Sequence, residues 1–261
     1  MRAMAFGLLL VVALLAAGRA ALAQSPETFE IGLSTDSISI TSDFAGERLV
    51  IFGSLDNADQ KILRQGGYDI IVVLEGPRRP AVVREKDRVL GLWINRGSES
   101  FETAPSSYAL ASTRALRDIS GSGILEQLGI GIDNLRLGFN RVPGTASPNR
   151  DQYAAALRRL RGEEGLYRET TAAVQFVSPS LFRAELALPA ALPVGQHLAR
   201  AFLFRRGEFL RERSEPLWVR KAGFENWIFE FSKDNGFVYG ILAVALAIFT
   251  GWFGRLAFKR D

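Results

Sequence analysis

The chain contains a single histidine, His197, which is its only imidazole for general acid–base chemistry. It lies at the expected start of a strand, and no G-x-S-x-G motif places a serine on a nucleophile turn. Serines and aspartates are abundant, but a Ser-His-Asp triad is defined by geometry and not by spacing. We therefore interpret His197 as a structural or surface residue and predict no catalytic residue.

Paired carboxylates are the second possible source of acid–base chemistry, as in glycosidases. Asp36 and Asp43 are candidates for such a pair. Both lie in a Thr/Ser-rich stretch, where hydrogen bonds between side chains and turn backbone explain acidic residues more simply. A cofactor-free envelope hydrolase is therefore kept only as an alternative.

Sulfur and metal chemistry are excluded by composition. The chain has no cysteine, and its two methionines, Met1 and Met4, both precede residue 24. Thiolate catalysis, disulfides, zinc ribbons and iron–sulfur clusters are thus excluded, and one histidine cannot build a multi-histidine metal site. No Lys-Ser or Lys-Thr of a phosphate loop follows the central glycines, which are Gly121, Gly123, Gly129 and Gly131. We expect no cofactor.

The basic charge of the chain lies at its two ends. Two of the 32 cations precede residue 24, and three cations and one of the 28 acids follow residue 254. Residues 24–254 therefore hold equal numbers of cations and acids. Nucleic-acid binding, which a basic chain would suggest, loses its main support.

A cationic stretch in the first half is the candidate binding site. Arg84, Lys86 and Arg88 alternate along one extended face, as the period of a strand requires. Such a face beside an aromatic side chain suits an anion or an acidic partner. The binding residues that we predict are Arg84, Lys86, Arg88, Trp93, Asn95 and Tyr108. The alternative, which the pattern favours, is a solvated sheet face with Trp93 buried in the core.

Short runs of β-branched residues predict the elements that hold this site. Residues 49–52 and 68–74 are such runs, 89–94 and 108–112 continue the pattern, and glycines separate them. This spacing predicts a mainly β fold, an Ig-like antiparallel β-sandwich. We assign residues 24–115 to it.

The strand-like pattern of apolar residues ends before residues 116–165, which we predict to be a helical insertion or linker. In it, Tyr153, Ala156, Leu157 and Leu160 follow helical spacing. A second β region follows over 166–221, with a hairpin turn at Arg206-Gly207. The pattern leaves open whether there are one or two sandwiches.

The two ends of the chain predict its cellular location and membrane topology. Arg2, a 12-residue apolar run and Ala21-Leu22-Ala23 predict a signal peptide over residues 1–23. Residues 236–254 are 19 uncharged residues, enough to span a bilayer of about 30 Å as a helix. The basic tail, 255–261, is expected in the cytoplasm by the positive-inside rule. We therefore predict a single-pass protein of the bacterial inner membrane, with a periplasmic N-terminus and a cytoplasmic C-terminus.

Residues 222–235 are predicted to form an amphipathic juxtamembrane helix, because their apolar residues recur at helical spacing. That face either contacts the lipid bilayer or packs on the β domain. The membrane-anchoring residues that we predict are Phe224, Trp227, Phe231, Tyr239 and Trp252.

The chain resembles a family of predicted transmembrane proteins of unknown function from Alphaproteobacteria. The resemblance is clearest in GLSTDSISITSDFAGERLVIFG (32–53), YDIIVVLEGP (68–77) and VREKDRVLGLWINRGSESFETAPSSYALAST (83–113). It implies a membrane address and supplies no catalytic residues. It also implies a sulfite-exporter-like permease as a partner.

Together these observations predict a single-pass membrane protein with a periplasmic β-sandwich that binds another envelope protein, such as a transporter. The alternatives are the cofactor-free hydrolase and a purely structural envelope protein.

Overall fold

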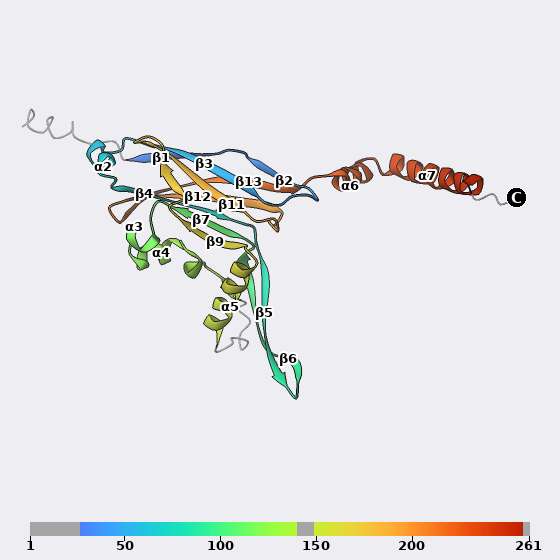
Figure 1. Ribbon diagram of the computed structural model, residues 1–261, viewed down its shortest axis with the longest axis horizontal. Coiled ribbons are helices and arrows are strands. Elements are labelled where there is room, and N and C mark those ends of the chain that lie inside the picture. The colour runs from blue at the N-terminus through green and yellow to red at the C-terminus, as the bar shows by residue number, and fades with distance from the viewer. Residues whose placement is uncertain (1–26, 140–148, 258–261) are drawn as a thin grey trace, which may run out of the picture.

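The computed structural model describes residues 27–139 and 149–257. Two β-sheets lie face to face, and a long hairpin and two C-terminal helices project from them (Figure 1). In order, the four-stranded sheet consists of β1 (Thr28–Leu33), β3 (Glu47–Asp56), β11 (Leu181–Leu188) and β10 (Val174–Phe176). The six-stranded sheet consists of β2 (Ser37–Ile40), β13 (Glu208–Lys221), β12 (Gly195–Arg205), β4 (Tyr68–Glu75), β7 (Tyr108–Ser112) and β9 (Tyr167–Thr171). The predicted signal peptide, residues 1–23, lies outside the described residues.

Strands from both halves of the chain alternate within the two sheets. β3 pairs with β1 on one side and with β11 on the other, and β4 lies between β12 and β7. The second β region therefore completes the sheets that the first region begins. The chain forms one sandwich, and the prediction of a mainly β, sandwich-type fold is confirmed.

Two edge pairs depart from the antiparallel pattern. β2 runs parallel to β13, and β9 runs parallel to β7. Parallel neighbours need a crossover connection of a dozen or more residues. The helical insertion between β7 and β9 supplies one such connection, so the six-stranded sheet is mixed at its edges.

The strand β4 is buried on both faces. Ile70 and Val72 pack into the core between the sheets, whereas Ile71 and Val73 pack into a second core against the helical insertion. Each such side chain contributes about 1.5–3 kcal/mol when fully buried. A strand covered on both faces needs a continuous apolar run, which explains the composition of residues 68–74.

The predicted insertion contains several short elements and one longer helix. They are α3 (Leu116–Ile119), α4 (Ser122–Leu128), η1 (Ile132–Asn134), β8 (Gly138–Phe139) and α5 (Arg150–Glu163); a further short helix, α2 (Gln60–Arg64), follows β3. The apolar face predicted for α5 is partly wrong, because Leu160 is 42% exposed. The buried residues of α5 are Tyr153, Ala154 and Leu157, and none lies in its last turn.

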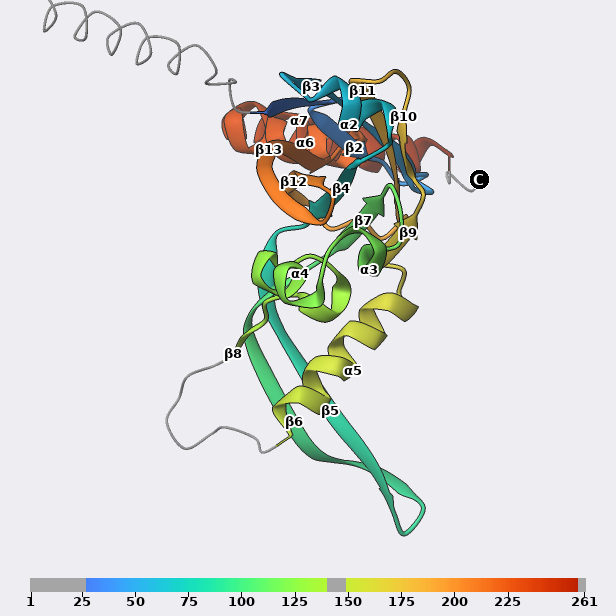
Figure 2. The same cartoon turned by 90° about the vertical axis from the view of Figure 1, so that its left-hand side faces the viewer.

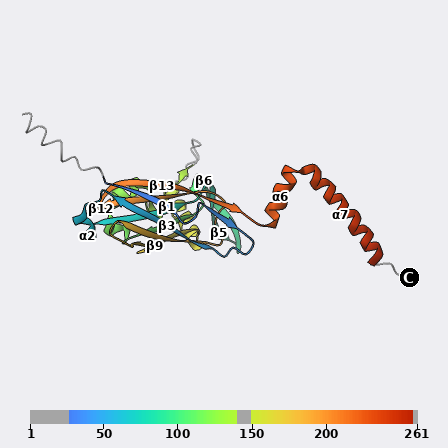
Figure 3. The ribbon, with the colours of Figure 1, turned by 90° about the horizontal axis from the view of Figure 1, so that it is seen from above.

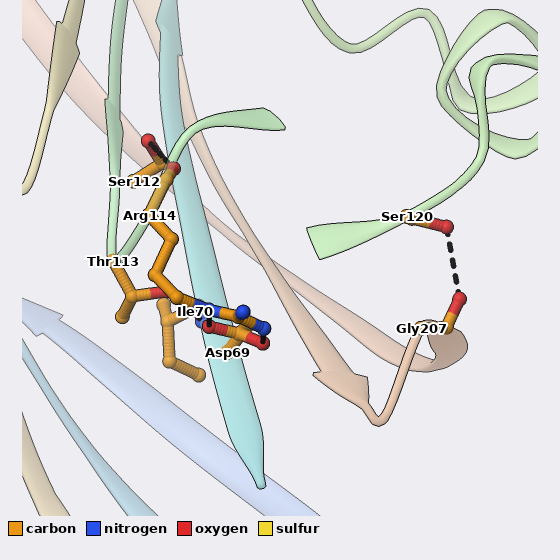
Figure 4. A network of polar contacts seen from close by, with 7 residues as sticks. All are labelled: Asp69, Ile70, Ser112, Thr113, Arg114, Ser120 and Gly207. Carbon is orange, nitrogen blue, oxygen red and sulfur yellow. Dashed lines mark hydrogen bonds and ion pairs between the residues drawn. The ribbon is translucent and has the colours of Figure 1, made fainter. Parts of the chain in front are cut away.

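A buried carboxylate ties the start of β4 to the chain that leads into the insertion (Figure 4). Asp69 accepts from Arg114 Nε at 2.9 Å and from Thr113 Oγ1 at 2.7 Å. Nearby, Ser120 Oγ donates to the carbonyl oxygen of Gly207 at 2.9 Å, which holds the β12–β13 turn against the insertion. Removing one partner of a fully buried pair costs about 3–5 kcal/mol. Because the Arg114 side chain is half exposed, the cost here is expected below that range.

A long hairpin, which we call the arm, projects from the sandwich (Figure 2). It consists of β5 (Arg78–Val89) and β6 (Leu92–Pro105). The structure corrects the single strand predicted over 89–94, because the chain reverses at Leu90-Gly91 and Val89 pairs with Leu92. Leu90 and Gly91 have φ angles of 50° and 85°. A two-residue hairpin turn with both φ angles positive usually contains Asn-Gly, so leucine conceals it in the sequence.

Among the described residues, packing partners contact the arm only at its base. Val83 and Phe101 of the arm pack with Tyr153 and Leu157 of α5. Tyr153 Oη also donates to Glu85 Oε2 at 3.2 Å. Short strand β8 pairs with β6 at this level as well. Beyond it, nearly every side chain from 86 to 96 is exposed.

Two helices extend from the end of the sandwich where β13 finishes (Figure 3). They are α6 (Phe224–Asp234) and α7 (Gly236–Ala257). Within the described part of the chain, one helical segment is long and apolar enough to cross a membrane, at Gly236–Gly254. No part of it is buried inside the protein. It coincides with the predicted span, and residues 258–261 of the tail lie outside the described residues.

The brace between α5 and the arm can be tested at Gly97. A Cβ there would lie 2.3 Å from Tyr153 Oη, so Gly97→Ala is expected to displace the tyrosine and to cost about 1–3 kcal/mol of unfolding free energy. Gly123→Ala in α4 is the control, because its Cβ would meet no atom within 4 Å. Thermal unfolding of the full-length chain measures both variants. An unfolding temperature of Gly97→Ala equal to that of Gly123→Ala would contradict the contact between Tyr153 and the arm.

Candidate functional site

The strand register of the arm brings most of the predicted binding residues together. Lys86 lies opposite Asn95, and Arg88 lies opposite Trp93. Because side chains alternate along a strand, these four share one face of the arm. Arg84 lies two residues further along the same strand and extends this face toward the base.

Tyr108 does not belong to this group. It lies at the start of β7 and is buried. Its hydroxyl oxygen accepts a hydrogen bond from the backbone N–H of Gly131 at 2.9 Å. Burial raises the pKa of Tyr108, so the phenol stays protonated. Tyr108 thus holds the insertion against the sheet, and its place in the predicted site is corrected.

Trp93 differs from the alternative that the sequence favours. It is 69% exposed near the end of the arm, not in the core. The core between the two sheets contains other aromatic residues, among them Phe29 and Phe182.

Large apolar side chains surround Trp93 at the end of the arm. We call this group the arm tip; it consists of Val89, Leu90, Leu92, Trp93 and Ile94, all exposed. Leu90 is 99% exposed and has a positive φ angle, which is unfavourable for a branched side chain. Strain and a contiguous exposed apolar patch are both features of interaction sites. Sequence analysis missed the patch, because its residues read as a buried strand.

Cations line the arm beside this patch. Among the described residues, Arg84, Lys86 and Arg88 form no ion pair, whereas Arg96 pairs with Asp87. Arg88 Nε donates only to the carbonyl oxygen of Gly91 in the turn, at 3.4 Å. The arm therefore presents positive charge next to apolar surface. This composition suits a partner surface that carries both negative charge and apolar groups.

The single histidine lies in a second polar cluster, far from the arm tip. His197 is fully buried, and its Nε2 lies 3.2 Å from Ser107 Oγ. Its other ring nitrogen, Nδ1, lies 3.3 Å from the carbonyl oxygen of Gly195, in the position that a carboxylate takes in a hydrolase triad. Ser107 is also buried, so a substrate has no direct path to this pair. The interpretation of His197 as structural agrees with this environment.

The predicted carboxylate pair lies on the surface. Asp36 and Asp43 lie on exposed stretches on either side of β2. No group of three or more potential metal ligands occurs within residues 27–139 and 149–257.

The predicted membrane-anchoring residues lie on the two projecting helices. Tyr239 and Trp252 are exposed on α7, and Phe231 is half-buried on α6. The side chains of Phe224 and Trp227 lie outside the described residues. An exposed apolar helix attached to a β-sandwich defines the class: a membrane protein with one candidate span near its C-terminus.

Comparison with known proteins agrees with this class. The chain belongs to the family described as "Putative transmembrane protein (Alph_Pro_TM)", which matches residues 28–260. The predicted membership of an uncharacterised transmembrane family is thereby confirmed. Among solved structures, the chain is similar to AggA, the major subunit of aggregative adherence fimbriae type I from Escherichia coli. The identity is 8% and the TM-score 0.27, over 76% of this chain and 97% of that one. No curated protein sequence matches the chain.

The burial of His197 predicts a pH dependence of stability. Desolvation lowers the pKa of His197 below 6.5, so the unfolded chain takes up a proton that the folded chain does not. Stability is therefore expected to fall as the pH drops below about 6.5, by at most about 1.4 kcal/mol per pH unit. His197→Gln should reduce this loss between pH 7 and 5.5, measured by denaturant unfolding. Ser107→Ala retains the imidazole and should keep the slope; an unchanged slope in His197→Gln would refute the assignment.

Proposed function

We propose that the protein is a single-pass inner-membrane protein whose sandwich lies in the periplasm and whose arm binds a second envelope protein, such as a transporter. The observation that carries the proposal is the arm tip, a cluster of exposed apolar side chains at the end of a projecting hairpin. The basic tail after α7 supports the orientation. A sulfite-exporter-like permease is the first candidate that the family resemblance suggests.

The composition of the arm suits a protein interface. Tryptophan and arginine are the residues that most often dominate binding energy, and both occur here as neighbours across the hairpin, at Trp93 and Arg88. Burying Leu90, Leu92 and Trp93 in a partner would contribute about 1.5–3 kcal/mol for each. That sum, about 4.5–9 kcal/mol, falls within the range of about 4–15 kcal/mol that association costs, so other contacts of the arm must add to it.

The backbone of the arm adds a second mode of contact. β5 is an edge strand of its sheet, since the order is β5-β6-β8. Its outer N–H and C=O groups are free of strand partners among the described residues, and an extended segment of a partner can pair with them. Charged side chains along this edge, Arg84, Lys86 and Arg88, restrict pairing to a partner of suitable charge.

The membrane helix gives the arm its place of action. In Figure 1, the arm runs across the direction of α7 and not along it. With α7 upright in a bilayer, the arm would extend beside the membrane, where the exported face of a neighbouring membrane protein lies. Confinement to one membrane raises the effective concentration of two such proteins and allows a modest interface to suffice.

The arm tip can be tested by crosslinking in cells. A photoreactive amino acid at position 92 of the full-length chain is expected to capture a discrete membrane protein, identified by mass spectrometry. The double variant Leu90→Ser, Trp93→Ser should reduce recovery of that protein at least tenfold, because about 1.4 kcal/mol already corresponds to tenfold. Reversal of charge in Arg84→Glu, Lys86→Glu should weaken capture in a salt-dependent manner.

The control replaces exposed apolar residues elsewhere on the sandwich. Phe52→Ser with Val177→Ser removes exposed apolar side chains away from the arm and should leave capture unchanged. Crosslinks from position 92 to lipid alone would assign the tip to the bilayer and overturn the proposal. Equal loss of capture in the control pair would also overturn it.

A further inference from the structure

We infer that a cleft at the root of the arm binds a small organic anion that carries a carboxylate or phosphate group. Two hollows of about 420 and 210 Å³ adjoin there, and both are lined by Glu75, Arg78 and Arg200. Arg136 lines the second hollow as well. We call these two hollows together the arginine cleft. It is separate from the arm tip and does not depend on the function proposed above.

The cleft exists because the insertion covers only part of the six-stranded sheet. Along β12, the outward side chains are Gln196, Leu198, Arg200, Phe202 and Phe204. The two phenylalanines lie in the core beneath the helices, whereas the three preceding side chains line the first hollow. The sheet face thus passes from covered to open at Arg200.

Protein contacts hold two guanidinium groups of the cleft in place. Arg78 Nε donates to Glu75 at 2.8 Å, and its Nη1 donates to the carbonyl oxygen of Arg136 at 2.9 Å. Arg200 Nε donates to Glu212 at 2.6 Å, and its guanidinium lies 4.8 Å from the centre of the Phe202 ring. These contacts use only part of the five N–H donors of each group. Remaining donors on groups already held in one orientation bind an oxyanion with little loss of side-chain entropy.

The charge and shape of the lining define the ligand. Three arginines line the cleft, against one lining acid, Glu75, and a second acid, Glu212, that pairs with Arg200, so the region keeps a net positive charge. Carboxylates and phosphates match the planar fork of arginine in bidentate hydrogen bonds. Leu198 is 40% exposed and forms, with Pro77, an apolar part of the first hollow. A ligand with an apolar body and one anionic group fits both features.

The position of the cleft gives such a ligand contact with three parts of the molecule. Arg200 belongs to the sandwich and Arg136 to the insertion, and Arg78 is the first residue of the arm. A bound anion would therefore neutralise arginines from all three and hold the root of the arm more firmly.

Phenyl phosphate, which combines an apolar ring with an anionic group, is the ligand that tests the inference. Inorganic phosphate carries the anionic group alone, and phenol carries the ring alone. Isothermal titration would use the full-length protein in nanodiscs of phosphatidylcholine. Phenyl phosphate is expected to bind more tightly than inorganic phosphate or phenol. Arg200→Gln should weaken it at least fivefold, and Glu75→Gln should tighten it severalfold, because the change removes the negative charge of the cleft. Arg220→Gln, an equal change of charge on the neighbouring strand outside the cleft, is the control and should leave affinity within twofold.

The outcomes separate the possible results. Opposite shifts in Arg200→Gln and Glu75→Gln, with Arg220→Gln unchanged, support the site and cannot arise from a loss of folding. The inference is overturned if phenyl phosphate at a 10-fold molar excess over millimolar protein does not bind. It is also overturned if the affinity changes equally in all three variants. Nanodiscs that contain phosphatidylglycerol distinguish the sources of the anion: weaker phenyl phosphate binding there identifies a lipid headgroup as the occupant, and unchanged binding identifies a free solute.

Discussion

Burial of the central strands on both faces is the constraint on which the rest of this structure depends. β4 and β12 pair along their length and face the four-stranded sheet on one side. Their other side carries Ile71, Val73, Phe202 and Phe204, which need a second apolar layer. The helical insertion between β7 and β9 supplies that layer, and its length permits the parallel pairing of β9 with β7. The second apolar layer and the parallel β7–β9 pair thus follow from one distribution of apolar residues.

The arm continues the pair of strands β4 and β7 out of the sandwich. The β4–β7 ladder reaches Glu75 and Tyr108, and two backbone hydrogen bonds then join Gly76 to Ser107 and Ser106 to Pro77. The β5–β6 ladder begins directly beyond them. Gly76 is required at this junction, since a Cβ there would lie 2.3 Å from Ser107 Oγ. The arm therefore continues the central sheet at its base, and its tip has no packing partner among the described residues.

Local patterns in the sequence predicted those features that depend on local composition. The apolar run of β4, the turn at Arg206-Gly207 and the long apolar helix each have a signal within a few residues, and each was found. The arm was missed for a physical reason: an exposed apolar tip has the same composition as a buried strand, and Leu90 replaces the usual turn residue. Likewise, the burial of Tyr108 and the grouping of Arg78, Arg136 and Arg200 arise from strand pairing and insertion packing. Neither can be read from spacing along the chain.

The even balance of charge in residues 24–254 conceals a separation of charge within the fold. Several arginines have carboxylate partners that fix sheet edges, such as Arg205 with Glu27 and Arg213 with Glu30. Pairing of this kind occupies several of the acids. Arg84, Lys86 and Arg88 of the arm are left without ion-pair partners among the described residues, and the three arginines of the cleft have two carboxylate partners, Glu75 and Glu212. A neutral sum is thus compatible with two positive regions, and the absence of net charge argues against nucleic acid without arguing against local recognition of anions.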